Sequence, residues 1–178
     1  MQRAIFLDRD GVIVKQFKVN GKSFPPRKFK NFRLYPYVEE RLKELNKKFL
    51  IFVITNQPDV KKGLMQMEDL NLMHQYLKEN LPIKEIYTCL HLKEENCICR
   101  KPSDYFIKKA KKKYDIDLEK SILIGDRESD IRAGNSSGCH SLFIDRNYNE
   151  NKPVNYKKKF YSFNQAAKFI ISEMSWRI

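Results

Sequence analysis

Short apolar runs alternate along the chain with longer segments in which apolar and polar residues mix. The runs are rich in branched and aromatic residues, which is typical of strands buried on both faces of a parallel sheet. They lie at residues 4–7, 49–54, 86–88, 121–124 and 141–144. The segments between them space their apolar residues as amphipathic helices do. They lie at residues 37–48, 68–80, 103–114, 129–137 and 164–173. This alternation predicts an α/β fold, a three-layer sandwich around a mainly parallel sheet with right-handed crossovers.

Two stretches interrupt this regular pattern near the N-terminus. Residues 12–14 are a short apolar piece that we expect to be extended, and residues 15–33 are mostly polar. The polar stretch contains Asn20-Gly21, a strong turn signal, and Pro25-Pro26, which excludes regular strand pairing. We therefore expect a hairpin or flap over the carboxyl end of the first strand.

The spacing of apolar residues indicates the buried faces of two predicted helices. For the helix over residues 37–48, this face is expected to hold Val38, Leu42 and Leu45.

The helix predicted over residues 68–80 has a larger apolar face. This face is expected to consist of Leu72, Met73, Tyr76 and Leu77. Met65 and Met67 are expected to fill the core beside it, as flexible thioether side chains commonly do.

The predicted strands end in residues that can carry chemistry. Asp8 and Asp10 follow the first strand one residue apart, so their side chains project to the same side of an extended backbone. The later strand ends lead to Thr55, Lys101, Asp126 and Asp130. In an open parallel sheet, ligands collect at the carboxyl ends of the strands. Acids there can hold Mg²⁺, a lysine and a hydroxyl can bind a phosphate, and a free carboxylate can attack phosphorus.

A second group of residues has the composition of a metal site. Cys89, His91, Cys97 and Cys99 lie close together in the sequence and provide three thiolates and one imidazole. This is a tetrahedral Cys₃His set for Zn²⁺ with no open position, so we expect a structural zinc ion that ties down a loop. The fourth cysteine of the chain, Cys139, is expected to be an ordinary buried residue.

Composition restricts the class of protein. At 178 residues, the chain suits one domain over residues 1–178, and 42% hydrophobic residues are enough for a full core. The net charge of +13 comes largely from runs of lysine, which solvated helix faces explain without a nucleic-acid partner. Arg3 and Asp8 interrupt the N-terminus before a signal peptide could develop, and no apolar run is long enough for a membrane span. We expect a cytoplasmic monomer that does not act at a membrane.

The residues at the strand ends resemble the four motifs of the haloacid dehalogenase (HAD) superfamily of phosphatases. The motifs, in the same order, are Asp8-Arg9-Asp10-Gly11, Thr55, Lys101 and Gly125-Asp126-Arg127-Glu128-Ser129-Asp130. The resemblance implies that Asp8 is the nucleophile and a Mg²⁺ ligand. It implies that Asp10 is the acid and base and gives Mg²⁺ its backbone carbonyl, and that Asp126 completes the metal site with support from Asp130. The phosphate-binding residues are then expected to be Thr55, Asn56, Arg100, Lys101 and Arg27.

The cysteine cluster narrows this resemblance. A zinc loop without a cap domain is similar to the branch that contains D-glycero-D-manno-heptose 1,7-bisphosphate phosphatase and the histidinol-phosphate phosphatase domain. Leu90 stands where that branch usually has proline, and Pro58-Asp59 stands where the heptose enzymes tend to have Ser-Gly. The resemblance implies a small phosphorylated substrate, most simply the heptose bisphosphate of lipopolysaccharide or capsule biosynthesis, with histidinol phosphate as the alternative.

Charge favours the sugar phosphate over histidinol phosphate. A basic flap with Arg27 and Arg100 would attract a second phosphate and repel an ammonium group. Unit charges 4 Å apart interact by roughly 4 kcal/mol at an effective dielectric constant of about 20. The rival classes are a nucleic-acid-directed 3′-phosphatase or binding protein and a purely structural zinc domain. The chain lacks the alternation of aromatic and basic residues that a stacking platform for single strands needs.

Overall fold

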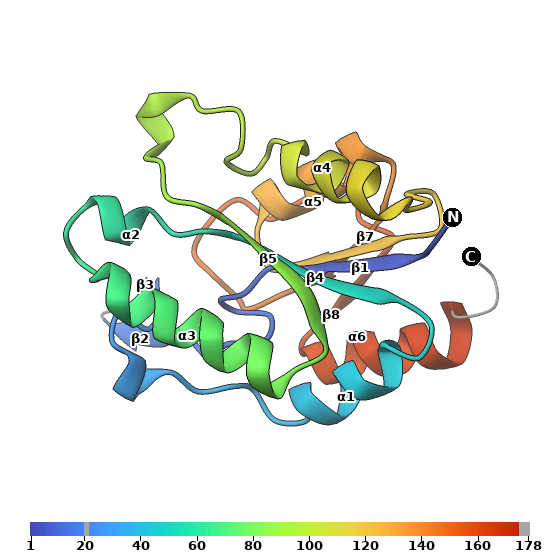
Figure 1. Ribbon diagram of the computed structural model, residues 1–178, viewed down its shortest axis with the longest axis horizontal. Coiled ribbons are helices and arrows are strands. Elements are labelled where there is room, and N and C mark those ends of the chain that lie inside the picture. The colour runs from blue at the N-terminus through green and yellow to red at the C-terminus, as the bar shows by residue number, and fades with distance from the viewer. Residues whose placement is uncertain (20–21, 175–178) are drawn as a thin grey trace.

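A six-stranded parallel sheet lies at the centre of the structure, a computed structural model that describes residues 1–19 and 22–174 (Figure 1). The strand order is β5-β4-β1-β6-β7-β8, and every neighbouring pair is parallel. The strands are β1 (Ala4–Leu7), β4 (Leu50–Asn56), β5 (Ile83–Cys89), β6 (Ile122–Gly125), β7 (His140–Ile144) and β8 (Lys158–Phe160). The three-layer α/β sandwich with a parallel sheet is therefore confirmed.

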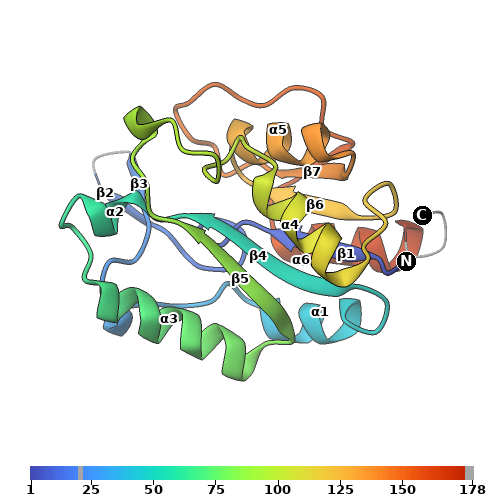
Figure 2. The same cartoon turned by 45° about the horizontal axis from the view of Figure 1, so that its top comes forward.

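Helices cover both faces of the sheet. Helices α1, α3 and α6 lie on one face and α4 and α5 on the other (Figures 1 and 2). The helices are α1 (Val38–Leu45), α2 (Pro58–Lys61), α3 (Met67–Asn80), α4 (Tyr105–Tyr114), α5 (Glu128–Ser137) and α6 (Phe163–Phe169). Shorter turns are η1 (Phe29–Asn31), η2 (Lys93–Glu95) and the π-helical η3 (Ile170–Met174). Of the helices in the described residues, none is both long and apolar enough to cross a membrane.

The central strands are apolar throughout because each packs against helices on both sides. In β1, Ile5 and Leu7 join the core beneath α1, α3 and α6, whereas Ala4 and Phe6 join the core beneath α4 and α5. All four side chains are fully buried. Successive residues of a strand point to opposite faces, so a strand between two helical layers must be apolar at every position.

The flap is a short antiparallel hairpin. Strands β2 (Phe17–Val19) and β3 (Lys22–Phe24) pair antiparallel, and the predicted Asn20-Gly21 turn lies outside the described residues. Between Asp10 and Thr55, the described chain forms this hairpin, η1 and α1 but no separate cap domain. The apolar piece at residues 12–14 is a turn closed by an isolated bridge from Val14 to Leu34, not a strand. The turn after Asp10, at Gly11, Val12 and Ile13, reverses the chain there before a strand can extend.

The buried face of α3 differs from the one predicted. Met73 and Leu77 are buried as expected, but the third buried residue is Leu70, while Leu72 and Tyr76 are 40% and 38% exposed. Both sets fit helical spacing, and packing against β5 and η1 decides between them. The ring of Tyr76 instead packs against Phe32, with centroids 5.7 Å apart.

Two further predictions of the sequence pattern are corrected. Met65 is buried, but Met67, at the start of α3, is 42% exposed and does not fill the core. Strand β8 lies in a stretch where the sequence pattern predicts no strand, and only Phe160 of its three residues is buried. An edge strand needs one apolar residue facing the core, which is too weak a signal to recognise in a sequence.

Candidate active site and metal centre

Three carboxylates meet where the two central strands end. Asp8 directly follows β1 and Asp126 directly follows β6, and these strands are neighbours in register, with Leu7 opposite Ile124. Asp130 lies in the first turn of α5. Oxygen atoms of Asp8, Asp126 and Asp130 all lie within 4.8 Å of one another. The parallel register thus brings together acids that are far apart in the sequence.

Lys101 supplies the positive charge beside these acids. Its Nζ donates to Asp8 Oδ1 at 2.6 Å and to the carbonyl oxygen of Ile54 at 2.7 Å, and it forms an ion pair with Asp130 Oδ1 at 2.7 Å. Burial would lower the pKa of Lys101, but the carboxylates of Asp130 and Asp8 outweigh burial and raise it. The lysine is therefore a fixed cation with all three protons directed at acceptors.

The acids are poised to receive a cation. Burial raises the pKa of Asp8 to about 6 despite the opposing charge of Lys101, and Asp130 and Asp10 add to the increase. Burial, Asp8 and Asp130 raise the pKa of Asp126 well above its ordinary value. Asp126 Oδ1 is buried without a hydrogen-bond partner among the described residues. An all-oxygen donor set with an unpaired buried oxygen fits Mg²⁺.

Two glycines allow the acids to approach. A Cβ atom on Gly11 would lie 1.8 Å from Asp126 Oδ2, and Gly11 has a φ of +90°. A Cβ atom on Gly125 would lie 2.1 Å from the Cβ of Asp130. Both positions exclude any side chain, so glycine is required for the acids to gather here.

Asp10 belongs to a different hydrogen-bond network from Asp8 and Asp126. Its Oδ2 accepts from Arg9 Nε at 3.0 Å and from Gln57 Nε2 at 2.7 Å. Gln57 Nε2 also lies 2.7 Å from Thr55 Oγ1 and so connects the ends of β1 and β4. Among the described residues, Asp10 Oδ1 is buried and has no hydrogen-bond partner.

The residues expected to bind phosphate are only partly brought together. Thr55 and Arg100 line the same cavity as Asp8 and Lys101. Asn56 also lines it, but its side chain is bound to the backbone of Lys101: Nδ2 donates to the carbonyl at 3.2 Å, and Oδ1 accepts from the amide at 3.1 Å. Asn56 therefore holds the lysine's backbone in place.

Arg27 lies beside the cavity, bound to one of its lining residues. Its Nε donates to Asp59 Oδ2 at 2.7 Å, and its guanidinium lies over the ring of Phe24. Asp59 lines the cavity, whereas Arg27 is not among the lining residues. The flap contributes Gln16 and Pro25 to the lining, and contact between its basic residues and a substrate stays a prediction.

The cavity has a volume of about 730 Å³, within the roughly 300–1,000 Å³ of small-molecule sites. Its positive charges come from the zinc-candidate loop and from α5 with the residue before it. They are Lys93, Arg100, Lys101, Arg127 and Arg132. Glu128 and Glu150 also line this side of the cavity, and Glu150 is paired with Arg127.

Several residues of the site were not recognised in the sequence. The hydroxyl of Tyr148, from the loop after β7, lies within hydrogen-bond distance of Asp126 Oδ2 and of Gln16 Oε1, and it can donate its single proton to one of them at a time. Burial and the charge of Asp126 raise the pKa of this hydroxyl. Gln57 and Arg9 hold Asp10 as described above. Tyr148 and Gln57 act across contacts between distant segments, which no spacing rule marks, whereas Arg9 holds its neighbour in the sequence.

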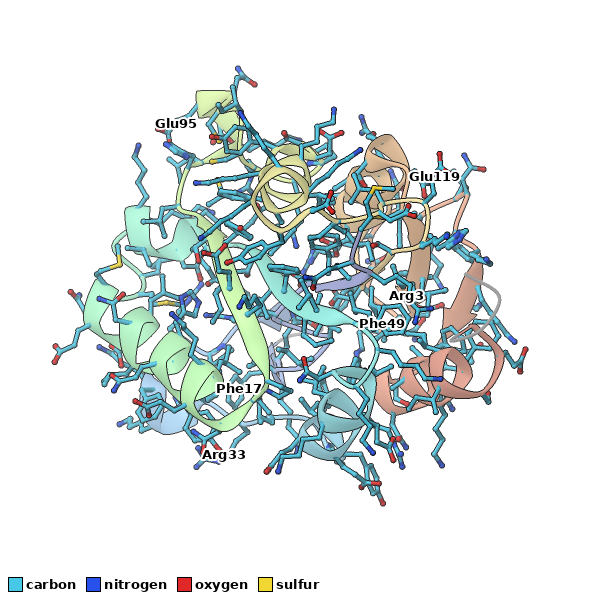
Figure 3. The ribbon with its side chains drawn as sticks, turned by 45° about the vertical axis from the view of Figure 1, so that its right-hand side comes forward. Arg3, Phe17, Arg33, Phe49, Glu95 and Glu119 are labelled. Carbon is cyan, nitrogen blue, oxygen red and sulfur yellow. The ribbon has the colours of Figure 1, made fainter. Side chains whose placement is uncertain are left out.

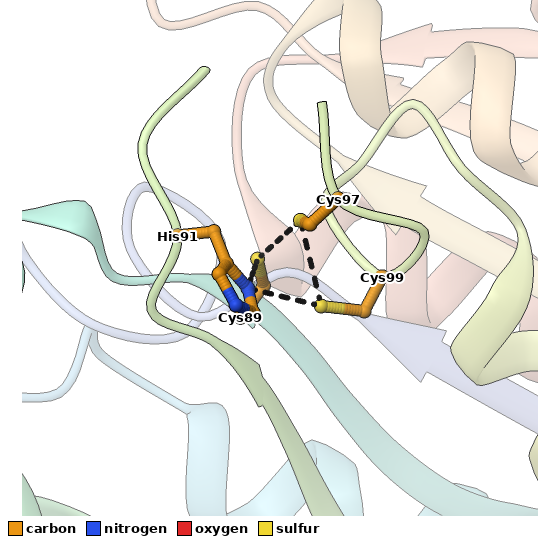
Figure 4. A group of neighbouring side chains, drawn as sticks. All are labelled: Cys89, His91, Cys97 and Cys99. Carbon is orange, nitrogen blue, oxygen red and sulfur yellow. Dashed lines mark hydrogen bonds between the residues drawn. The ribbon is translucent and has the colours of Figure 1, made fainter. Parts of the chain in front are cut away.

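The four residues of the zinc candidate converge in the loop after β5 (Figure 4). Neighbouring sulfurs are 3.6 Å apart for Cys89 and Cys97 and 3.7 Å apart for Cys97 and Cys99. His91 Nδ1 lies 3.6 Å from the sulfur of Cys89 and 3.5 Å from that of Cys99. A tetrahedral Zn²⁺ ion would space two sulfurs about 3.8 Å apart and a sulfur and a nitrogen about 3.6 Å apart. The ligand atoms therefore fit zinc.

This loop projects beyond the sheet and returns to the candidate active site. Glu95, in η2, lies at the edge of the molecule, well away from Phe49 beside the start of β4 (Figure 3). Arg100, the residue before Lys101, lies where the loop returns to the sheet. Its Nη1 donates to the carbonyl oxygen of His91 at 2.9 Å. The Lys101–Pro102 peptide bond is cis. A metal ion in the loop would therefore fix the backbone that presents Lys101.

Comparisons with known proteins agree with this geometry. Residues 98–166 match the family model described as HAD-hydrolase-like. The D-glycero-beta-D-manno-heptose-1,7-bisphosphate 7-phosphatase of Helicobacter pylori (strain J99) is 36% identical over 155 residues, which cover 82% of this chain and 84% of that protein. The D-glycero-alpha-D-manno-heptose-1,7-bisphosphate 7-phosphatase of Campylobacter jejuni is 30% identical and covers 94% of this chain and 95% of that one.

A solved structure shares the fold over nearly the whole chain. It is the crystal structure of D,D-heptose 1,7-bisphosphate phosphatase from B. bronchiseptica complexed with magnesium and phosphate. The TM-score is 0.80 at 22% sequence identity, with 97% of this chain and 99% of that chain covered.

Proposed function

This chain belongs to the haloacid dehalogenase superfamily of phosphatases, and on that premise we propose that it hydrolyses D-glycero-D-manno-heptose 1,7-bisphosphate, with Mg²⁺ and an aspartyl-phosphate intermediate. The observation that carries the proposal is the convergence of Asp8, Asp126 and Asp130 within 4.8 Å, with Lys101 bound to two of them. Asp8, Asp126 and the backbone carbonyl of Asp10 are the proposed Mg²⁺ ligands, and Asp130 supports them. When bound, Mg²⁺ offsets the charge of these acids and of the phosphoryl oxygens.

Asp8 is the proposed nucleophile. Lys101 holds its Oδ1 at 2.6 Å, which leaves Oδ2 to attack. This oxygen forms a bond to phosphorus, and the bond from phosphorus to the sugar oxygen breaks. The positive charge of Lys101 and the hydroxyl of Thr55 stabilise the phosphoryl group while charge moves onto its oxygens.

Asp10 is the proposed acid and base. It gives a proton to the sugar oxygen as that oxygen leaves, so the product is a neutral alcohol. Water then attacks phosphorus of the aspartyl-phosphate, Asp10 takes the proton of the water, and the bond to Asp8 breaks. Inorganic phosphate leaves and both aspartates return to their starting states.

The substrate is proposed from the relatives and from the cavity. Both curated relatives are named as 7-phosphatases of a manno-heptose 1,7-bisphosphate, one of the beta and one of the alpha anomer. A cavity of about 730 Å³ suits a sugar bisphosphate. Arg100, Lys93 and Arg132 in its lining can attract the phosphate that remains on the sugar. We propose that the phosphate on carbon 7 is removed and that Zn²⁺ in the Cys₃His site is structural.

Phosphate release tests this proposal. Purified protein with Mg²⁺ is assayed on both anomers of the heptose bisphosphate, on histidinol phosphate and on 3′-phosphorylated DNA. We expect the highest kcat/KM on a heptose bisphosphate and retention of the anomeric phosphate in the product, which ³¹P NMR identifies. A higher kcat/KM on histidinol phosphate or on DNA than on either heptose bisphosphate would contradict the proposed substrate.

The control variant is Asp8→Asn, which keeps the shape of the side chain but removes its nucleophilic oxygen. We expect it to release no phosphate from any substrate. Mg²⁺-dependent release that persists in this variant would exclude an aspartyl-phosphate on Asp8.

A further inference from the structure

Arg9 is a buried cation that the reaction described above does not use. It lies between Asp8 and Asp10, directly after β1, and its side chain has 0% exposure. Burying a guanidinium is costly unless its donors are paired. Its partners therefore show why the chain keeps a charge at this position.

The partners of Arg9 join Asp10 to a helix of the outer layer. Arg9 Nε donates to Asp10 Oδ2 at 3.0 Å, and Nη2 lies 2.9 Å from the same oxygen. On its other side, Arg9 Nη1 lies 3.2 Å from His74 Nε2, in the middle of α3. A guanidinium has only donors, so the imidazole nitrogen must accept.

His74 is suited to act as a neutral acceptor. Burial and the charge of Arg9 lower the pKa of His74 to about 3, so the ring is neutral at neutral pH. The contact with Arg9 requires the tautomer that carries its proton on Nδ1 and leaves Nε2 to accept. His74 comes from α3, whose neighbouring Met73 and Leu77 are buried in the core. The ring is therefore held by a packed helix and offers Arg9 a rigid acceptor.

The two carboxylate oxygens of Asp10 differ in their hydrogen bonds. Oδ2 receives Arg9 and Gln57, whereas Oδ1 has no hydrogen-bond partner among the described residues. A carboxyl group held by one oxygen presents the other in a fixed direction. That is the arrangement a general acid needs, because proton transfer requires a defined position within hydrogen-bond reach of the leaving oxygen.

We propose that His74 is a positioning residue for proton transfer: it holds Arg9, and Arg9 holds Oδ2 of Asp10 so that Oδ1 delivers the proton. This inference rests on the proposed function, since it takes Asp10 as the acid. Without His74, Nη1 of Arg9 becomes a buried donor with no acceptor, which favours rotation of the guanidinium. The carboxyl group of Asp10 then loses its fixed direction.

The test compares His74→Leu with His74→Gln. Both keep a side chain of similar size on a helix, but only glutamine offers an acceptor to Arg9. Each variant is assayed for kcat/KM on the heptose bisphosphate and on p-nitrophenyl phosphate. A sugar oxygen is strongly basic and needs a proton to leave, whereas nitrophenolate leaves as a stable anion. Because kcat/KM extends only to formation of the aspartyl-phosphate, the second half of the reaction does not affect the comparison.

We expect His74→Leu to lower kcat/KM on the bisphosphate by about 10- to 100-fold, part of the roughly 10²–10⁴-fold contribution of a general acid. On p-nitrophenyl phosphate, we expect a loss of less than about threefold, since no proton is needed there. His74→Gln should recover most of the bisphosphate activity. If His74→Leu does not fold, His74→Met provides the same comparison.

Equal losses on the two substrates, or no loss on either, would overturn the role of His74. Asp10→Asn in the same assays separates this failure from failure of the proposed function. If Asp10→Asn loses activity selectively on the bisphosphate and His74→Leu does not, only the role of His74 is wrong. If Asp10→Asn shows no such selectivity, Asp10 is not the acid and both statements are wrong.

Discussion

Replacing Asp8 by asparagine should stabilise the metal-free protein at neutral pH while it abolishes phosphatase activity. Burial raises the pKa of Asp8 from 3.8 to about 6, even though Lys101 lies beside it. A raised pKa means that the folded state prefers the neutral carboxyl group more than the unfolded chain does. The stability that Asp8 contributes is thus fully present below the unfolded pKa and is lost as the pH rises through about 6.

The size of the effect follows from the shift. A difference of about two pKa units at 1.36 kcal/mol each is about 3 kcal/mol, most of which falls between about pH 4 and pH 8. Asparagine does not titrate, so the variant lacks this loss. We expect the two proteins to be of similar stability near pH 4 and Asp8→Asn to be more stable by about 2–3 kcal/mol near pH 8.

Urea unfolding in EDTA across this pH range measures the difference. Asp69→Asn is a control of opposite sign, because hydrogen bonds from the Phe29 amide and Lys28 lower the pKa of Asp69. The stability from that carboxylate is present above the unfolded pKa and lost on acidification, so Asp69→Asn should be less stable than the parent near pH 8. Parallel pH curves for Asp8→Asn and the parent would refute the reasoning, as would a variant that is less stable near pH 8.

Two further predictions concern the glycine beside the acids and the zinc loop. Gly11→Ala should abolish activity and weaken Mg²⁺ binding measured by calorimetry. The new Cβ would lie 1.8 Å from Asp126 Oδ2, so the carboxylate of Asp126 would have to move away. Gly63→Ala also has a positive φ but open space around it, so it should cost only about 1 kcal/mol of stability in thermal unfolding and keep Mg²⁺ binding and activity. Cys97→Ser should lower the zinc content from about one ion per chain and reduce the melting temperature, whereas Cys139→Ser should keep the zinc, since Cys139 lies outside the cluster. Metal analysis that finds the same zinc content in both cysteine variants would contradict the Cys₃His assignment.

The central strands could be predicted because a buried strand is a continuous run of apolar residues in the sequence. A strand between two helical layers must be apolar at every position, and β1 and β4 show such runs. Strand β8 has one buried residue, so it shows no apolar run in the sequence. In α3, Leu70 and Leu72 were equally compatible with helical spacing, and only contacts with the sheet and η1 bury the first and expose the second.

Some residues of the candidate site could likewise be predicted from the sequence, and others could not. Asp8, Lys101 and Asp126 could be found because each follows a recognisable strand end or motif. Arg27 was expected in the site as part of a basic stretch, and the structure pairs it with Asp59, a residue of the cavity lining. The charge of a segment is visible in a sequence, whereas the partner that takes up that charge is not.

The alternation of the central strands with the longer helices, the acids at the strand ends and the four ligands of the zinc candidate could all be read from the amino-acid sequence. These follow from periodicity and from side-chain chemistry within short segments. The contacts of His74 with Arg9 and of Tyr148 with Asp126 become visible only once the chain is folded. Such contacts join segments far apart in the chain, and their energy depends on packing that no local pattern encodes.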